Sequence, residues 1–306
     1  MITLTNTQAN EVAHAISDER RRMGSPAVGM VLTLLVITDE QNQAEALAAA
    51  SEAAREHPMR VIGLIERHGR ETARLDAQIH VGGDEGAGEL IACRLHGELS
   101  QHAGSVAIPL LLPDTPVVAW WPSAGPFHPA SDHIGGHAQR RITDTFTDAH
   151  YLESLARRFE NYSPGDTDLA WTRTTPWRSM LAAALDQPVG RVTEVQVQVQ
   201  SRNPSGVLLA GWLQQCLKVP THITHGRNPG INKVVLTTTK GQVKLSRPDG
   251  KVAQLDVPGM PPSTVALPRR TLAELLAEEL RRLDPDEIYL QALRGVHHVL
   301  HPEVKK

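Results

Sequence analysis

The sequence predicts an α/β protein of two domains, each a mixed sheet packed with helices, with α+β character in its C-terminal part. The length of 306 residues fits two domains of ordinary size. In the first third, runs of β-branched residues and leucine alternate with Ala- and Glu-rich segments, which is typical of strands covered on both faces. Further along, residues 194–200 alternate Val with Gln or Glu, which is typical of a strand with one exposed face.

The first third predicts a helix followed by a βαβ unit. Apolar residues at helical spacing predict a helix over 8–23, which Gly24-Ser25-Pro26 ends. A strand is predicted over 28–37, a helix over 42–57 and a second strand over 59–66. Because a helix joins the two strands, we expect them to be parallel neighbours.

The middle of the chain predicts an antiparallel strand pair, then a proline-rich stretch and helices. The pair covers 74–81 and 89–95, and the glycine-rich segment 82–88 is predicted to be the turn between them. Among the prolines that follow, only 115–121 is predicted to be a strand, because proline cannot donate to a sheet. The helices predicted after it cover 134–141, 149–160 and 176–185.

The last part predicts a smaller α+β domain. It contains the alternating strand 194–200, a helix over 204–217, a three-strand meander over 232–239, 242–246 and 252–257, and two helices over 272–283 and 285–293. We therefore expect an N-terminal domain over 1–188, which includes an aromatic-rich segment at 113–180. A C-terminal domain over 189–295 and a flexible tail over 296–306 complete the prediction.

Charge and cysteine content exclude several classes of protein. The 31 Lys and Arg residues nearly balance 34 Asp and Glu residues without a run of one sign, so neither a nucleic acid nor a membrane is expected as a partner. No secretory signal is visible, which favours the cytoplasm. Cys93 and Cys216 both lie in apolar segments, and we expect two buried, reduced thiols.

The familiar catalytic and cofactor motifs are missing. The first predicted strand runs into Asp39-Glu40-Gln41-Asn42, which lacks the glycines that a dinucleotide-binding turn needs. The glycines at 82–88 are not followed by Lys-Ser or Lys-Thr, and no serine-hydrolase or zinc-protease motif occurs. His128, His133 and His137 are interrupted by two glycines and predict no metal site. The sequence thus predicts no catalytic residue, no cofactor and no metal.

Aromatic residues and arginines gather in one window. Nine of the eleven aromatic residues lie within 120–177, and arginines flank several of them. Aromatic and arginine side chains are typical of protein interfaces, and arginines also bind anions, but a compact core tied by Arg–Asp pairs fits equally well. If the window binds a partner, the expected residues are Trp120, Trp121, Arg140, Arg141, Asp144, Trp171, Arg173, Trp177 and Arg178.

Five segments together resemble a known family. They are Ile108–Pro122, Ala138–Asp144, Asp168–Arg173 with Pro176–Arg178, Leu208–Leu213, and Leu276–Asp286. Their order and spacing resemble the glucose-6-phosphate dehydrogenase assembly protein family, OpcA, over nearly the whole chain up to about Gly295. The family supplies no catalytic residue to carry over.

The resemblance implies a non-enzymatic activator. Such a protein binds NADP-dependent glucose-6-phosphate dehydrogenase and promotes its active oligomer or conformation, which supplies NADPH through the oxidative pentose phosphate pathway. In the cyanobacterial branch it also implies thioredoxin-linked control, which we do not expect here because the two cysteines lie in apolar segments. The alternative from the residues alone is a phosphosugar-binding sensor or enzyme with an arginine-lined anion site formed by Arg140, Arg141, Arg173 and Arg178.

Overall fold

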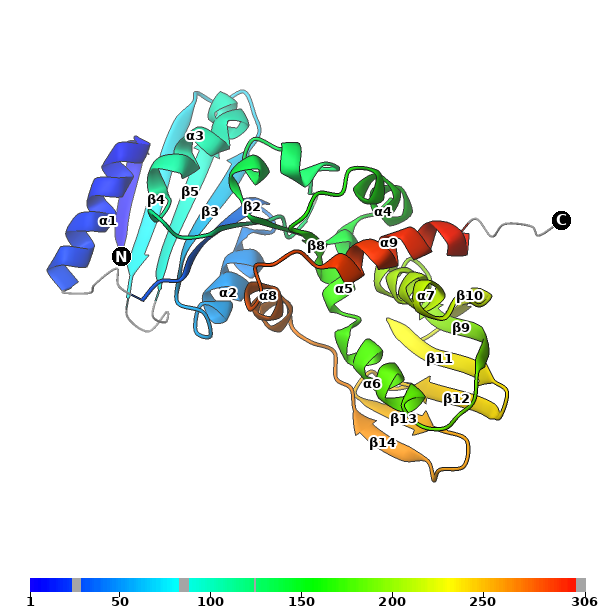
Figure 1. The fold of residues 1–306 in the computed structure, drawn as a ribbon. Coiled ribbons are helices and arrows are strands. Elements are labelled where there is room, and N and C mark those ends of the chain that lie inside the picture. Colours follow the sequence, from blue (N-terminus) through cyan, green and yellow to red (C-terminus); the bar gives the residue numbers. More distant parts are fainter. Residues whose placement is uncertain (24–28, 83–87, 124, 301–306) are drawn as a thin grey trace. The chain divides into compact units, whose positions relative to one another are not determined.

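A computed structural model describes the chain except residues 24–28, 83–87, 124 and 301–306. Two compact units make up the chain, and each contains a mixed sheet packed with helices, which confirms the predicted fold class (Figure 1). Unit 1 comprises Met1–Asp144, Gly165–Thr167 and Thr271–Pro285, and unit 2 comprises Thr145–Pro164, Asp168–Arg270 and Asp286–Lys306. The units interleave along the chain, whereas the sequence predicted a single division, after residue 188. That linear division into domains stays a prediction.

Unit 1 is built on an eight-stranded sheet in the order β1-β4-β5-β3-β2-β6-β7-β8. The run from β5 to β7 is parallel, and β4 and β1 extend it antiparallel at one edge. The parallel β2–β3 pair and the antiparallel β4–β5 pair were both predicted. The strands are β1 Ile2–Thr7, β2 Leu32–Asp39, β3 Met59–Arg67, β4 Arg74–Val81, β5 Glu89–His96, β6 Val117–Trp120, β7 Arg140–Thr143 and β8 Asp166–Asp168.

Helices cover both faces of this sheet. On β3, Ile62 and Leu64 join the core under α1 (Ala9–Met23) and α3 (Ala103–Ala107). Gly63 between them faces the other side, where a Cβ would lie 2.7 Å from Leu47 of α2 (Gln43–Ala53). Helix α8 (Leu272–Leu280) packs against α2, although about 220 residues separate them in the chain. Covered faces explain why β2 and β3 are almost uniformly apolar.

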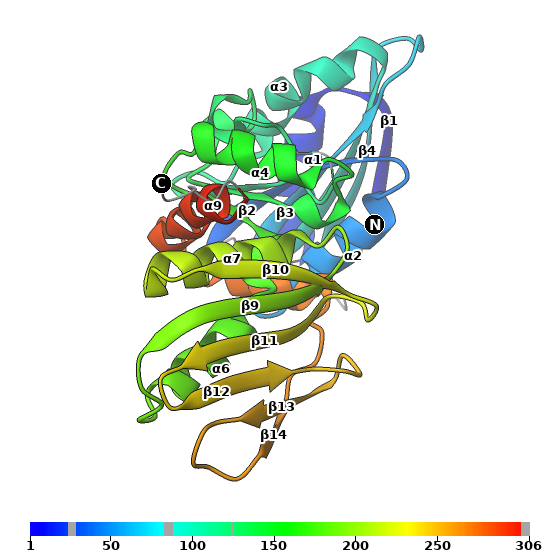
Figure 2. The ribbon, with the colours of Figure 1, turned by 90° about the vertical axis from the view of Figure 1, so that its right-hand side faces the viewer.

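Unit 2 contains a six-stranded sheet in the order β10-β9-β11-β12-β13-β14 (Figure 2). The predicted meander β11–β12–β13 is confirmed as antiparallel, while β10 pairs with β9 in parallel. In β9 the valines are buried and Glu194 and Gln196 are exposed, as the alternation predicted. The strands are β9 Val192–Gln200, β10 Thr221–Gly226, β11 Ile231–Thr238, β12 Gly241–Ser246, β13 Val252–Asp256 and β14 Ser263–Ala266.

Two apolar clusters organise the helices of unit 2. The first joins the buried face of the sheet to α6 (Thr175–Leu185) and α7 (Pro204–Leu217). The second joins α4 (Tyr151–Glu160) and α5 (Leu169–Thr172) to α7 and α9 (Glu287–Leu300). Residues 296–300, expected to belong to a tail, form the end of α9.

None of the helices in the described part of the chain combines the length and apolar character that a membrane crossing requires.

The helix predicted over 134–141 is wrong. The segment instead forms a short 3-10 turn, Gly135–His137, followed by β7, which pairs in parallel with β6. Two adjacent glycines disfavour a helix, and pairing with β6 gives the backbone of Arg140–Thr143 its hydrogen bonds. Strands β1, β7, β8, β10 and β14 were not predicted; most are short or rich in polar residues.

Candidate functional site

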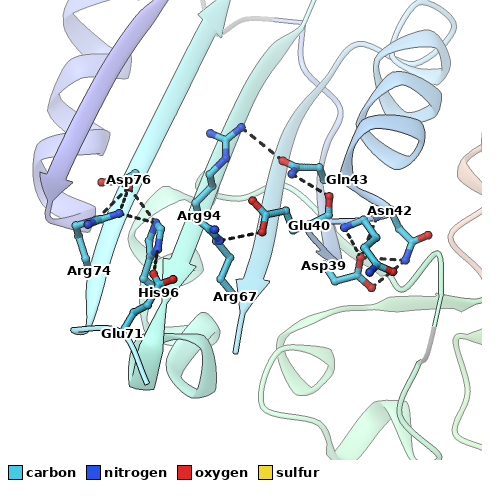
Figure 3. A network of polar contacts seen from close by, with 11 residues as sticks. Asp39, Glu40, Asn42, Gln43, Arg67, Glu71, Arg74, Asp76, Arg94 and His96 are labelled. Carbon is cyan, nitrogen blue, oxygen red and sulfur yellow. Dashed lines mark hydrogen bonds and ion pairs between the residues drawn. The ribbon is translucent and has the colours of Figure 1, made fainter. Parts of the chain in front are cut away.

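The carboxyl edge of the parallel strands in unit 1 is the usual ligand position of an α/β sheet. Strand β2 ends there at Asp39, β3 at Arg67 and β5 at His96 (Figure 3). A phosphate at this edge would use the free amides that begin α2. A phosphate could bind there only if those amides had no other hydrogen-bond acceptor.

The carboxylate of Asp39 occupies the turn that begins α2. Its Oδ1 accepts hydrogen bonds from the backbone N–H of Gln41 at 2.8 Å and of Asn42 at 2.9 Å. The side-chain amide of Asn42 donates to both carboxylate oxygens, at 2.9 and 2.8 Å. A negative charge of the protein thus already stands where a pyrophosphate would bind, and it would repel one. The turn thus lacks glycine, and two of its amides already donate to Asp39.

The rest of this edge is a network of polar contacts (Figure 3). Arg67 lies 3.1 Å from Glu40, and Arg94 donates to Gln43 at 3.5 Å. Buried His96 lies between Glu71, 2.9 Å from its Nδ1, and Asp76, 2.9 Å from its Nε2. The hydrogen bond with His96 lowers the pKa of Glu71, and hydrogen bonds from Asn6 and Arg74 lower the pKa of Asp76 against the opposing effect of burial. These pairs stabilise the ends of the strands.

The predicted site residues in unit 1 are all buried. Trp121 packs in the core cluster with Ile134 and Ala138, while Trp120 is fully buried outside that cluster, as expected for neighbours on opposite faces of a strand. Arg140 forms an ion pair with Glu279 of α8 and donates to the carbonyl of Asp284 at 2.7 Å.

Two further predicted residues of unit 1 also lie inside it. Arg141 pairs with Asp166 and donates to the carbonyl of Ala138 at 2.7 Å. Asp144 is 2% exposed. The Arg–carboxylate pairs that the sequence analysis weighed against an interface are therefore present at Arg140 and Arg141.

The predicted residues of unit 2 divide into buried tryptophans and partly exposed arginines. Trp171 and Trp177 are each 1% exposed and belong to different apolar clusters. The guanidinium of Arg178 stacks 3.8 Å from the ring centroid of Trp171, and that of Arg173 lies 4.7 Å from the ring centroid of Phe146. Of the nine expected residues, only Arg173 and Arg178 are partly exposed. Partner binding by this set stays a prediction.

The four arginines of the alternative anion site do not gather in one place within a unit. Arg140 and Arg141 belong to unit 1, where each has its own buried carboxylate, and Arg173 and Arg178 belong to unit 2. No group of three or more His, Cys, Asp or Glu side chains among the described residues could hold a metal ion. Cys93 is buried as predicted, but Cys216 is exposed on α7, so its predicted burial is wrong.

Comparison with protein families gives a match to two consecutive domains, both described as parts of a glucose-6-phosphate dehydrogenase subunit. Residues 50–160 match the N-terminal domain of that family, and residues 164–293 match its C-terminal domain. The chain belongs to the OpcA family. The matched ranges contain all nine residues that the sequence predicted to bind a partner. They cover parts of both compact units.

A curated relative carries the same family name. It is the "Putative OxPP cycle protein OpcA" of Synechocystis sp., 22% identical over 186 residues, which are 56% of this chain and 37% of the relative. The chain thus matches less than half of that OpcA protein.

Two solved structures that resemble this OpcA family member are oxidoreductases. KijD10, a 3-ketoreductase from Actinomadura kijaniata, is 12% identical with a TM-score of 0.49, covering 89% of this chain and 97% of that one. An oxidoreductase from Sinorhizobium meliloti is 10% identical with a TM-score of 0.49, covering 88% and 95%. At this level of similarity these structures carry no argument about function.

Unit 2 of this OpcA family member contains a cavity of about 310 Å³ that no sequence pattern predicted. Its charged lining consists of Arg173, Arg247, Arg269 and Arg270. Only Arg173 was singled out from the sequence, because the other three come from segments without aromatic neighbours in the chain. An Arg269-Arg270 pair between a strand and a helix was the one local signal available.

Proposed function

We propose that this chain binds glucose-6-phosphate dehydrogenase and promotes the active oligomer or conformation of that enzyme, without catalysing a reaction itself. The observation that carries the proposal is the family match over residues 50–160 and 164–293, whose descriptions name a glucose-6-phosphate dehydrogenase subunit. The name of the Synechocystis relative, a putative OxPP cycle protein, points to the same pathway.

The turn after β2 supports the non-catalytic part of the proposal. NADP-dependent enzymes with this kind of sheet bind the pyrophosphate at the start of the first helix. Here the Asp39 carboxylate holds the amides of Gln41 and Asn42. A partner protein, rather than this turn, would then hold the dinucleotide.

The physical mechanism of activation is selective binding. A protein that binds one state of an enzyme more tightly than another shifts the population toward that state, by no more than the difference in affinity. The chain would therefore bind the active oligomer or conformation of the dehydrogenase more tightly than the inactive form.

The first prediction tests activation. Purified dehydrogenase from the same source is titrated with the chain, NADPH formation is followed, and the oligomeric state is measured by light scattering at each point. Activity should rise and saturate as the complex forms, and the chain alone should produce no NADPH from glucose 6-phosphate. The proposal is wrong if the chain alone turns over substrate, or if a saturating amount neither binds nor activates the dehydrogenase.

The second prediction concerns the surface that binds the dehydrogenase. Arg173 and Arg178 are the partly exposed members of the predicted set, so Arg173→Ala or Arg178→Ala should weaken dehydrogenase binding by about 1–3 kcal/mol, as truncation of an interface anchor does. Calorimetry measures the binding, and circular dichroism checks the fold. Arg157→Ala is a matched control, because Arg157 is an exposed arginine of unit 2 that pairs with Glu153 within its own helix. Unchanged binding in both test variants would place the interface elsewhere.

A further inference from the structure

The cavity of unit 2 is formed by segments that are distant in the sequence. The first turns of α6 and α7 contribute Trp177 and Ser205, the end of β9 contributes Gln200, and Phe146 also lines the cavity. The segment that follows β14 adds Arg269 and Arg270. Sequence-distant residues of one compact unit thus meet around a space of about 310 Å³.

The lining carries strong positive charge. Four arginines line the cavity, and none of the described residues that line it is acidic. Arg269 donates to the carbonyl of Pro229 at 2.8 Å, and Arg270 donates to the carbonyl of Thr172. The carbonyl orients the guanidinium of Arg269 without neutralising its charge, so a preorganised positive charge faces the cavity.

Arg247 is the most unusual member of this set. It is 8% exposed. Its Nη1 donates to the carbonyl of Leu267 at 3.0 Å, and its Nη2 donates to the carbonyl of Ile231 at 3.5 Å. Its Nε has no hydrogen-bond partner, and Arg247 forms no ion pair with any described residue. A buried cation without a counter-ion is costly, and such groups are normally paired.

Burial and the nearby charge of Arg269 lower the pKa of Arg247 to about 10. The guanidinium therefore stays charged at neutral pH, but its surroundings in the protein destabilise that charge. An anion bound beside it would remove that penalty.

A second polar group of the cavity also lacks a partner. The hydroxyl of Ser205, 3% exposed, has no hydrogen-bond partner among the described residues. It lies in the first turn of α7, a 14-residue helix whose positive dipole end favours an anion. The Nε of Arg247 and the hydroxyl of Ser205 thus both lack a hydrogen-bond partner among the described residues, and both residues line the cavity.

From these contacts we propose that the cavity of unit 2 binds a phosphate monoester the size of a sugar phosphate. The phosphate lies among Arg247, Arg269 and Arg270, and Ser205 donates to it or to a neighbouring hydroxyl. The uncharged part of the ligand lies against Phe146 and Gln200. The volume is at the lower end of the range of about 300–1,000 Å³ for small-molecule sites, which fits a monosaccharide phosphate better than a dinucleotide. This proposal does not rest on the proposed binding of the dehydrogenase.

The test uses the full chain alone, by isothermal titration calorimetry. The probes are glucose 6-phosphate, glucose, inorganic phosphate and NADP. Glucose 6-phosphate should bind with the highest affinity, and glucose should not bind. The proposal is overturned if no probe binds, if inorganic phosphate binds as tightly as the ester, or if NADP binds more tightly than the ester.

Two variants locate the site. Arg269→Gln should weaken glucose 6-phosphate binding at least tenfold, because Arg269 lines the cavity, and because it is exposed its replacement leaves the buried residues in place. Arg202→Gln is the matched control, since Arg202 is also an exposed arginine of unit 2 held by a backbone carbonyl, that of Ala149 at 2.8 Å, but does not line the cavity. Equal weakening by both variants, or no weakening by Arg269→Gln, would overturn the location. No dehydrogenase is present, so failure here is distinguishable from failure of the proposed function.

Discussion

Buried arginines in this chain occupy two different environments. Arg140 and Arg141 each pair with a buried carboxylate, whereas Arg247 donates to backbone carbonyls and lies 5.1 Å from the ring centroid of Trp177. The sequence alone could predict that Arg140 and Arg141 serve a structural or a binding role, but not which, because the partner Glu279 lies 139 residues further along. Arg247 gave no local signal at all. Its importance depends on a cavity that exists only after the chain has folded.

The lowered pKa of Asp76, which contacts His96, predicts how the stability of the protein changes in acid. The folded-state pKa of Asp76 is lowered, so its contribution to stability is complete above the ordinary pKa of 3.8 and is lost as pH falls through the lowered value. Asp76→Asn removes the ion pair with Arg74 and changes the contact with His96, and it should lower the free energy of unfolding by about 1–3 kcal/mol at pH 7. Urea unfolding at pH 7 and pH 3 should show this difference shrinking in acid.

Asp18→Asn is the control for that measurement. Asp18 pairs with Arg21, and both side chains are largely exposed, so its replacement should change stability little at either pH. An Asp76→Asn deficit that stays constant from pH 7 to pH 3 would show that the carboxylate charge is not what stabilises this edge.

Helices and strands were predicted correctly where the sequence pattern of the segment itself determines its structure. The alternation in β9 and the apolar runs of β2 and β3 each specify a strand and its buried faces locally. Prediction failed for β7, because Arg140–Thr143 becomes a strand by pairing with β6 rather than by its own pattern. Polar edge strands such as β10 were not predicted for the same reason, because β10 forms a strand by pairing with β9.

The close packing of α7 and α9 depends on two glycines. A Cβ on Gly295 would lie 1.9 Å from the carbonyl oxygen of Gly211, and a Cβ on Gly211 would lie 2.4 Å from that of Ala292. Backbone atoms cannot move aside as a flexible side chain can, so Gly211→Ala or Gly295→Ala should destabilise the protein by about 1–3 kcal/mol even though alanine favours helices. Thermal unfolding measures the loss. Gly136→Ala is the control, because the nearest atom to its Cβ would lie at an ordinary 3.6 Å; equal losses would argue against a packing effect.

Over the whole chain, the sequence predicted the fold class and the family but not how the segments combine. The helix over 272–280 was expected in a C-terminal domain, yet it packs on α2 and supplies Glu279 to Arg140 in unit 1. Its apolar face and its capping box, Thr271 with Glu274, specify a helix but not its neighbour. Most of the predicted site residues proved to be buried for a related reason: large aromatic residues are equally suited to a core and to an interface.

The last prediction concerns the reactivity of the two cysteines and their effect on activation of the dehydrogenase. Burial raises the pKa of Cys93 to about 12, so its thiol is unreactive, while Cys216 is exposed and has a pKa that partial burial raises. A maleimide should therefore modify one thiol in the native chain, at Cys216, and two after denaturation, as mass spectrometry can measure. Because a raised pKa disfavours the reactive thiolate, the variant with both cysteines replaced by serine should activate the dehydrogenase as the wild type does. Activation should also be equal under reducing and oxidising conditions. Cys93→Ser and Cys216→Ser separately are the controls. A redox response in the wild type that Cys216→Ser abolishes would instead make this exposed thiol a regulatory site.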